Sequence, residues 1–348
     1  MSASVAGQYN TFTKSHESTH GLTTDYSRNP KKFQLSEWAQ YVNVDKNTGY
    51  YLEMTVEMAG RVLNSDLGDL DWPDGAPRPK GWGNTDQFEF KSYITKRRTS
   101  TYSVGELAAD QASFPLLDRN ARIHAQRMIT AVTQTAITAA TTSGNYATGH
   151  ALAVSSVPGV TGSGYHDQST TARMDIKRTL DYGAELIMND TLGAVEPDEI
   201  MVVMGPEYAR RVSVSQEIVD YVKQSPVARE FIEKRLGPAA AFGLPEYLHG
   251  YKTVVERARK TTSRKGGTTA KSAILSDDYL IMCSRPGGLE GVEGAPSFST
   301  FTIFWKEEMT VESRHDKNDR RYEGSITCDW HAVVTAPISG VLFTSPTS

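Results

Sequence analysis

The sequence predicts an α+β protein in which extended segments accompany one long helix and a mixed α/β unit. Apolar and polar residues alternate in residues 51–59 and again in 88–94, with the period of β-strands. Apolar side chains recur every three or four positions in residues 113–142, with the period of one long α-helix. A short apolar strand at 199–204 is followed directly by the start of a helix, which is typical of α/β units.

The composition of the 348 residues is that of an ordinary soluble protein, with 39% hydrophobic and 22% charged residues. The net charge of −4 argues against wholesale coating of nucleic acid. No apolar run approaches the roughly 18 residues of a membrane span, and the polar start lacks a signal peptide, so we expect a cytoplasmic product. Cys283 and Cys328 are too few and too distant for a disulfide framework, and we expect buried free thiols.

The first 40 residues predict an arm. Their large apolar side chains are sparse and follow neither the strand nor the helix period, so they form no local core. We therefore expect this segment to lie on a neighbouring subunit, with Phe12, Phe33 and Trp38 among its contacts. Deleting residues 1–40 is expected to leave the remaining chain folded.

The alternating segments 51–59 and 88–94 predict two strands of one ribbon. Residues 60–87 between them contain three prolines, five glycines, Trp72 and Trp82. Such a long connection is uncommon in a compact domain unless it is functional, and exposed indoles favour docking on a neighbour. Nearby charged residues are expected to set register and partner choice across that contact. They are Arg61, Arg78, Lys80, Arg97 and Arg98.

Further elements follow in order along the chain. The long helix is expected to end at the step Ser143-Gly144-Asn145, and a second helix over residues 171–192 to end at Gly193. After the strand at 199–204, Pro206 opens another helix, because proline is tolerated at the first helical positions. Strands are then expected near 251–255, 273–283, 298–305 and 326–334.

Read in this order, the elements resemble the major capsid proteins of tailed bacteriophages, the Hong Kong ninety-seven-type shell fold. The phrases that carry the resemblance are EIMVVMGPEYARRV, FGLPEYL, AILSDDYLIMCSRPG and MTVESRHDKNDRRYEGSITCDWHAVVTAPISG. The resemblance covers nearly the whole chain and implies a division into parts. These are an N-terminal arm (1–44), an extended β-hairpin loop (45–103), a peripheral domain (104–169) with its spine helix (113–142), a mixed α/β axial domain (170–305) and a return to the peripheral domain (306–348).

The resemblance also implies a function: a structural, non-enzymatic subunit of the virion. Copies would assemble in the host bacterial cytoplasm as hexamers and pentamers, forming an icosahedral shell around phage double-stranded DNA, which is enclosed without sequence-specific binding. The implied partners are other copies, a portal and a decoration protein. Because the arm-like sequence begins near Met1, we expect a scaffolding protein on a separate chain, or none.

Two other functions compete with this interpretation. An encapsulin-like nanocompartment shares the fold and loads a protein cargo, but the long arm-like start disfavours it. A cytosolic α/β enzyme would use residues 170–305, but the sequence offers no convergent site there. No catalytic residue, cofactor, metal or membrane contact is expected.

Several motifs have a chemical interpretation that the sequence does not sustain. The acidic stretch 66–75 suggests a calcium loop, but Pro73 and Lys80 stand where an EF-hand needs ligands. Glycines in 287–294 precede a strand rather than a helix, so they predict a turn and not a phosphate loop. His166-Asp167 and His315-Asp316 lack a nucleophile motif.

Six basic residues gather in residues 257–271, where they could contact phosphates or an acidic neighbour. No aromatic residue interleaves with them, so a base-stacking surface is not supported. We expect a solvated loop.

Overall fold

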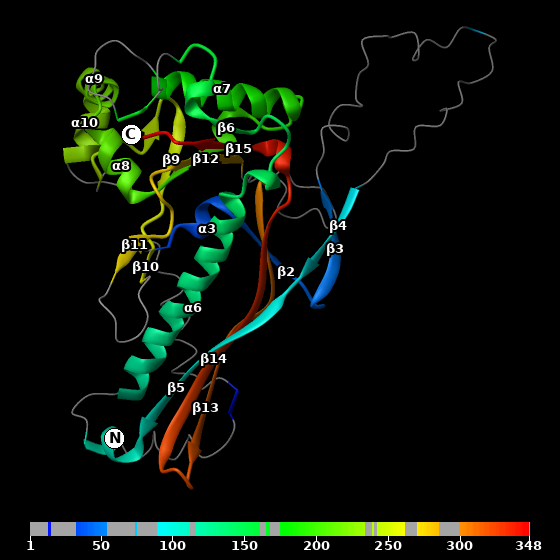
Figure 1. Ribbon diagram of the computed structural model, residues 1–348, viewed down its shortest axis with the longest axis vertical. Helices are drawn as coiled ribbons and strands as arrows, with labels where there is room; N and C mark the ends of the chain where they lie inside the picture. The colour runs from blue at the N-terminus through cyan, green and yellow to red at the C-terminus, as the bar shows by residue number, and fades with distance from the viewer. Residues whose placement is uncertain are drawn as a thin grey trace.

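The computed structural model confirms the α+β class. It describes residues 13–14, 33–53, 74, 89–111, 116–160, 165–167, 175–233, 239, 242–261, 270–284 and 299–347. Within these residues, two large sheets and one long helix organise the chain (Figure 1).

A long antiparallel hairpin forms the centre of the first sheet, whose strand order is β1-β13-β14-β5. β2 adds to β13 in parallel, whereas β1 adds to it antiparallel. The strands are β1 (Thr13–Lys14), β2 (Gln40–Asn43), β5 (Lys96–Gly105), β13 (Phe301–Asp316) and β14 (Arg321–Val334). The predicted strand at 298–305 is therefore the beginning of a much longer one, and the predicted domain boundary at 305 falls inside it.

Helix α6 (Leu116–Ala140) covers one face of this sheet and confirms the predicted long helix. Its buried stripe is rich in alanine, which lets β14 approach closely, and the Trp330 Nε1 donates a hydrogen bond to Thr135 Oγ1 at 2.8 Å. The helix ends as predicted, in a short 3-10 turn (Ser143–Asn145). Asn145 Nδ2 donates to the Ala139 carbonyl at 2.8 Å and so satisfies one of the carbonyls left free at the helix end.

The second sheet is mixed, with strand order β6-β15-β12-β7-β9-β8. Its strands are β6 (Ala151–Ala153), β7 (Ile200–Met204), β8 (Tyr247–Leu248), β9 (Tyr251–Val255), β12 (Tyr279–Ser284) and β15 (Gly340–Thr344). Its helices are α7 (Asp175–Asp190), α8 (Pro206–Ser213), α9 (Gln216–Gln224) and α10 (Pro226–Glu233). The predicted second helix, the helix opened by Pro206 and the strand at 251–255 are thereby confirmed.

The predicted strand at 273–283 is two strands. β11 (Lys271–Ala273) pairs with β10 (Arg259–Thr261) in a separate hairpin, and β12 begins only at Tyr279. A turn interrupts the run because Ser276 Oγ accepts a hydrogen bond from the Asp278 amide at 3.3 Å, a local alternative to strand pairing.

The mixed sheet is buried on both faces by its own chain. Alternate residues of β7 divide between two cores: Met201 and Val203 face a core shared with α6 and the first sheet, whereas Val202 and Met204 face a core beneath α7 and α8. This double burial explains the unbroken apolar run of the strand. The free thiols of Cys283 and Cys328 are buried in the first core, as predicted. No helix in the described part of the chain is long and apolar enough to cross a membrane.

Candidate subunit interface

The predicted ribbon is confirmed where the structure describes it: β3 (Thr48–Glu53) and β4 (Glu89–Ile94) pair antiparallel, with Leu52 opposite Phe90. Residues 54–59 of the predicted first strand and residue 88 of the second lie outside the described residues. It packs on the face of the first sheet that is turned away from α6 (Figure 1). The Tyr93 ring stacks on Phe304 with a centroid distance of 4.4 Å, and the Tyr51 ring lies 5.5 Å from the same phenyl group. The inner face of the ribbon is therefore satisfied within the subunit.

The outer face of the ribbon is apolar and largely exposed. Tyr50, Phe90 and Ile94 retain 77%, 63% and 52% of their accessible surface. The register places these side chains on the same face, because Tyr50 pairs with Ser92 between the pairs Leu52–Phe90 and Thr48–Ile94. Neighbouring exposed aromatic and aliphatic groups are typical of protein interaction surfaces. We call this set, Tyr50, Phe90 and Ile94, the ribbon outer face.

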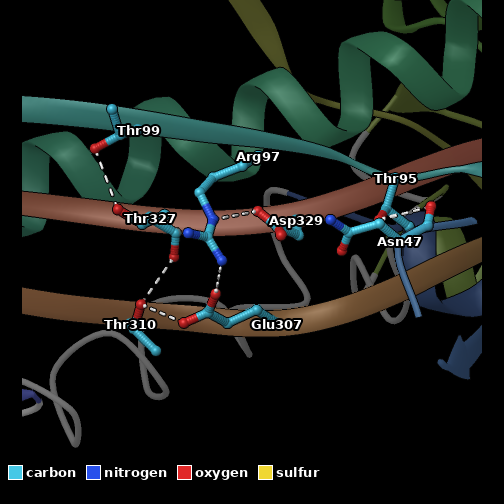
Figure 2. A network of polar contacts seen from close by, with 8 residues as sticks. All are labelled: Asn47, Thr95, Arg97, Thr99, Glu307, Thr310, Thr327 and Asp329. Atoms are coloured by element: carbon cyan, nitrogen blue, oxygen red, sulfur yellow. Dashed lines mark hydrogen bonds and ion pairs between the residues drawn. The ribbon is translucent and has the colours of Figure 1, made fainter. Parts of the chain in front are cut away.

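A polar network lies beside the ribbon on the same side of the first sheet (Figure 2). Arg97 donates from Nε to Asp329 Oδ1 at 3.3 Å and from Nη2 to Glu307 Oε2 at 3.2 Å. It thereby ties β5 to β14 and to β13, at the point where β13 departs from regular pairing. Asp329 is only 1% exposed, so the guanidinium offsets the cost of burying a carboxylate.

Hydroxyl groups continue this network along the strands (Figure 2). Thr327 Oγ1 donates to Thr99 Oγ1 at 3.2 Å, and Thr310 Oγ1 donates to Glu307 Oε1 at 3.3 Å. Among the described residues, the face opposite α6 thus carries polar side chains along this network and aromatic side chains where the ribbon packs. Of the predicted contact residues, Arg97 lies here with its side chain 65% exposed, and its role between subunits stays a prediction.

Three other predicted contact residues serve the subunit's own packing. Trp38 is fully buried and meets Phe301 edge to face at 5.1 Å, and Phe33 is 8% exposed in the same core. The structure therefore places Phe33 and Trp38 in the subunit's own core, and their contact with another subunit stays a prediction. Arg98 is half-buried, with its guanidinium 4.0 Å from the centre of the Trp330 ring, and burial lowers its pKa.

Segment 33–39 is held on the chain by helix α3 (Leu35–Trp38) and by Glu256. The Gln34 amide donates to Glu256 Oε2 at 3.1 Å, and Lys252 lies 3.4 Å from Glu37. Glu256 is fully buried, and desolvation raises its pKa to about 7 although backbone amides partly oppose the shift. Because this segment belongs to the core, deleting residues 1–40 would remove buried side chains, and whether the remaining chain then folds stays a prediction.

Remaining predicted contact residues lie outside the described residues: Phe12, Arg61, Trp72, Arg78, Lys80 and Trp82. So do the glycine stretch 287–294 and, apart from Asp74, the acidic stretch 66–75. Among the residues that the structure describes, no group of three or more His, Cys, Asp or Glu side chains is placed to hold a metal ion.

His166 is closed inside the second core. Its Nε2 donates to Thr179 Oγ1 at 3.0 Å, because that hydroxyl already donates to the Asp175 carbonyl, and its Nδ1 accepts from Tyr208 at 2.7 Å. This pattern requires a neutral ring, and burial lowers the pKa of His166 to about 4. His315 stacks on Tyr322 at 4.6 Å. Both rings are used in packing.

The basic cluster is described in part. Arg259, Lys260 and Lys271 lie on the β10–β11 hairpin, whereas residues 262–269 lie outside the described part. Arg257 lies 5.2 Å from the centre of the Phe242 ring, a cation–π contact within the subunit. Whether this hairpin faces DNA, a neighbour or solvent stays a prediction.

Comparison with known proteins identifies the fold. No family model matches the sequence, and no curated protein matches it. Among solved structures, a phage-related protein from Bordetella bronchiseptica RB50 aligns with a TM-score of 0.63 and 14% identity, over 93% of this chain and 96% of that one. The capsid of cyanophage P-SCSP1u aligns with a TM-score of 0.52 and 10% identity, over 89% and 87%.

A virus-like particle from Pyrococcus furiosus aligns with a TM-score of 0.50 and 8% identity, over 94% of this chain and 98% of that one. These alignments span nearly the whole length of each protein, so the likeness concerns the complete architecture and not one shared motif. The chain has the fold of phage capsid proteins, and the fold class predicted from the sequence is confirmed.

Proposed function

We propose that this chain is the major capsid protein of a tailed bacteriophage. Copies assemble as hexamers and pentamers into an icosahedral shell that encloses double-stranded DNA in the virion. The observation that carries the proposal is the ribbon outer face, an exposed apolar surface on a chain with a capsid fold. A shell subunit needs such a surface, because apolar side chains that are exposed in the isolated subunit become buried between subunits when the shell closes.

The energetics of this surface suit repeated assembly. Burial of apolar area contributes about 25 cal/mol per Å², and a stable pairwise interface commonly buries about 800 Å² on each partner. Tyr50 and Phe90 are of the residue class that dominates interface energies, because large rings bury much area at little cost in side-chain entropy. Many such contacts hold a lattice together even when each one is modest.

Partners other than copies of the chain follow from the same proposal. We infer that the partners are a portal, a decoration protein and, where one is used, a scaffolding protein encoded as a separate chain. We infer that assembly takes place in the host cytoplasm. Arg61, Arg78, Lys80, Arg97 and Arg98 are proposed to set register between subunits, and Phe12, Trp72 and Trp82 to bury apolar area. For Arg98, its stacking on Trp330 limits this role to the exposed part of its side chain.

The proposal is tested on particles purified from the cells that produce them. Electron microscopy measures whether they form closed icosahedral shells, and nuclease treatment followed by quantification of the surviving nucleic acid measures their content. We expect shells with protected double-stranded DNA. Closed shells that instead hold a protein cargo and no DNA would favour the encapsulin-like alternative, and a protein that never forms shells would contradict both.

A further inference from the structure

A hydrogen bond to a histidine joins the base of the ribbon to the first sheet. Amide groups of an antiparallel strand point alternately toward and away from its partner. Thr95 points inward and donates to the Asn47 carbonyl at 2.8 Å, so the Ile94 amide points out of the ribbon. It donates to Nδ1 of His331 on β14 at 3.2 Å.

His331 lies where the ribbon packs. Its cross-strand neighbour is Phe304, the ring on which Tyr93 and Tyr51 lie. The hydrogen bond joins β4 to β14, and the aromatic contacts join β4 and β3 to β13, so both hold the ribbon against the same hairpin of the first sheet. An imidazole nitrogen accepts a hydrogen bond only when it carries no proton, so this contact requires His331 to be neutral at Nδ1.

The charged groups around His331 are cationic. Lys96 and Arg98 on β5 both disfavour a charged imidazole, and together with desolvation, the larger cause, they lower the pKa of His331. On the ribbon face that packs against the first sheet, the described ionisable side chains are the phenols of Tyr51 and Tyr93 and the ion pair of Lys91 with Glu53, whose charges cancel. On β14, the Asp329 carboxylate forms an ion pair with Arg97.

We propose that His331 is a pH-sensitive latch that sets whether the ribbon is held against the first sheet. In the neutral state it accepts the Ile94 amide and the ribbon is docked. When Nδ1 takes a proton from solvent, it becomes a hydrogen-bond donor and can no longer accept from the Ile94 amide. The charged imidazolium is also repelled by Lys96 and Arg98, and the ribbon base is released from the first sheet. This inference goes beyond the proposed function and does not depend on it, because it concerns the isolated subunit.

Hydrogen exchange of the isolated subunit, resolved to the Ile94 amide by NMR, tests the latch. Protection factors remove the intrinsic effect of pH, and the Thr95 amide is the internal control because its acceptor does not titrate. As pH falls from about 7.5 through the lowered pKa of His331, we expect protection of Ile94 to fall roughly tenfold in the wild type, as befits the loss of one hydrogen bond. Protection of Thr95 should stay constant.

Two variants make the result specific to His331. His331→Asn keeps an acceptor oxygen in place of Nδ1 but does not titrate in this range, so its Ile94 protection should not change with pH. Lys96→Gln removes a nearby positive charge and should move the wild-type transition to higher pH. Protection of Ile94 that is flat in the wild type, or that falls equally in His331→Asn, would overturn the proposal; so would an unmoved transition in Lys96→Gln.

Discussion

The mixed sheet and the ribbon bury their side chains in opposite ways. β7 has all five positions buried, because α7 and α8 cover one face and the core shared with α6 covers the other. β3 packs Tyr51 on Phe304 but leaves its neighbour Tyr50 77% exposed. The first region is buried within one chain, whereas the second has one face packed on the first sheet and one face largely exposed. If the proposed function holds, stability and assembly depend on different residues.

The sharpest contrast lies between two aromatic residues near the N-terminus, Trp38 and Tyr50. Trp38 is fully buried, and Trp38→Ala should lower the free energy of unfolding of the subunit by about 3–5 kcal/mol through lost burial and a cavity. Tyr50→Ala should change it by no more than about 0.5 kcal/mol, since that ring is exposed. Chemical denaturation of both variants provides the measurement. Equal losses would contradict the assignment of segment 33–39 to the core.

The pH dependence of stability should come in part from Glu256, which joins that segment to β9. Its folded pKa of about 7 lies above the ordinary value of 4.5, so its stabilising contribution is complete below the lower value and is lost as pH rises through the higher one. We expect the free energy of unfolding to fall by roughly 2–3 kcal/mol across this window. Glu256→Gln should remove that slope in a denaturation series; an unchanged slope would exclude Glu256 as its source.

Gly205, directly after the central strand β7, tests how closely the mixed sheet is packed at the end of that strand. A Cβ added at Gly205 would lie 2.4 Å from the Leu275 carbonyl oxygen, and backbone does not move aside easily. We expect Gly205→Ala to cost about 1–3 kcal/mol of unfolding free energy through overpacking. Gly144→Ala is the matched control, because a Cβ there meets no atom within 4 Å. Similar thermal midpoints for the two variants would contradict close packing at Gly205.

The sequence predicts elements whose evidence is local and misses those whose partners are distant. The period of α6 extends over 25 residues, and the alternation of β3 and β4 shows which faces are apolar, so helix and ribbon are predictable. Helix α3 has only four residues, too few to show a period, and its partner Phe301 lies far along the chain. No pattern in the arm could therefore reveal that Trp38 is buried in its own subunit.

The polar contacts were unpredictable for the same reason. Arg97 and Asp329 are separated by 232 positions, and Ile94 and His331 by 237. Only the fold brings β4 and β5 beside β14. The sequence identified Arg97 as a charged residue at the ribbon, but it contained no signal for the two carboxylates that surround it.

The central claim is that the ribbon outer face is closed by another copy of the chain, and the double variant Tyr50→Ala with Phe90→Ala tests it most directly. The control is Thr48→Ala with Ser92→Ala, which shortens polar side chains of the same two strands. Particle yield is measured by sedimentation and electron microscopy, beside the thermal midpoint of the unassembled subunit. We expect the double variant to keep the wild-type midpoint and to lose most of its particles, roughly tenfold or more, whereas the control assembles normally. Normal particle yield from the double variant, with its subunit folded, would contradict the account.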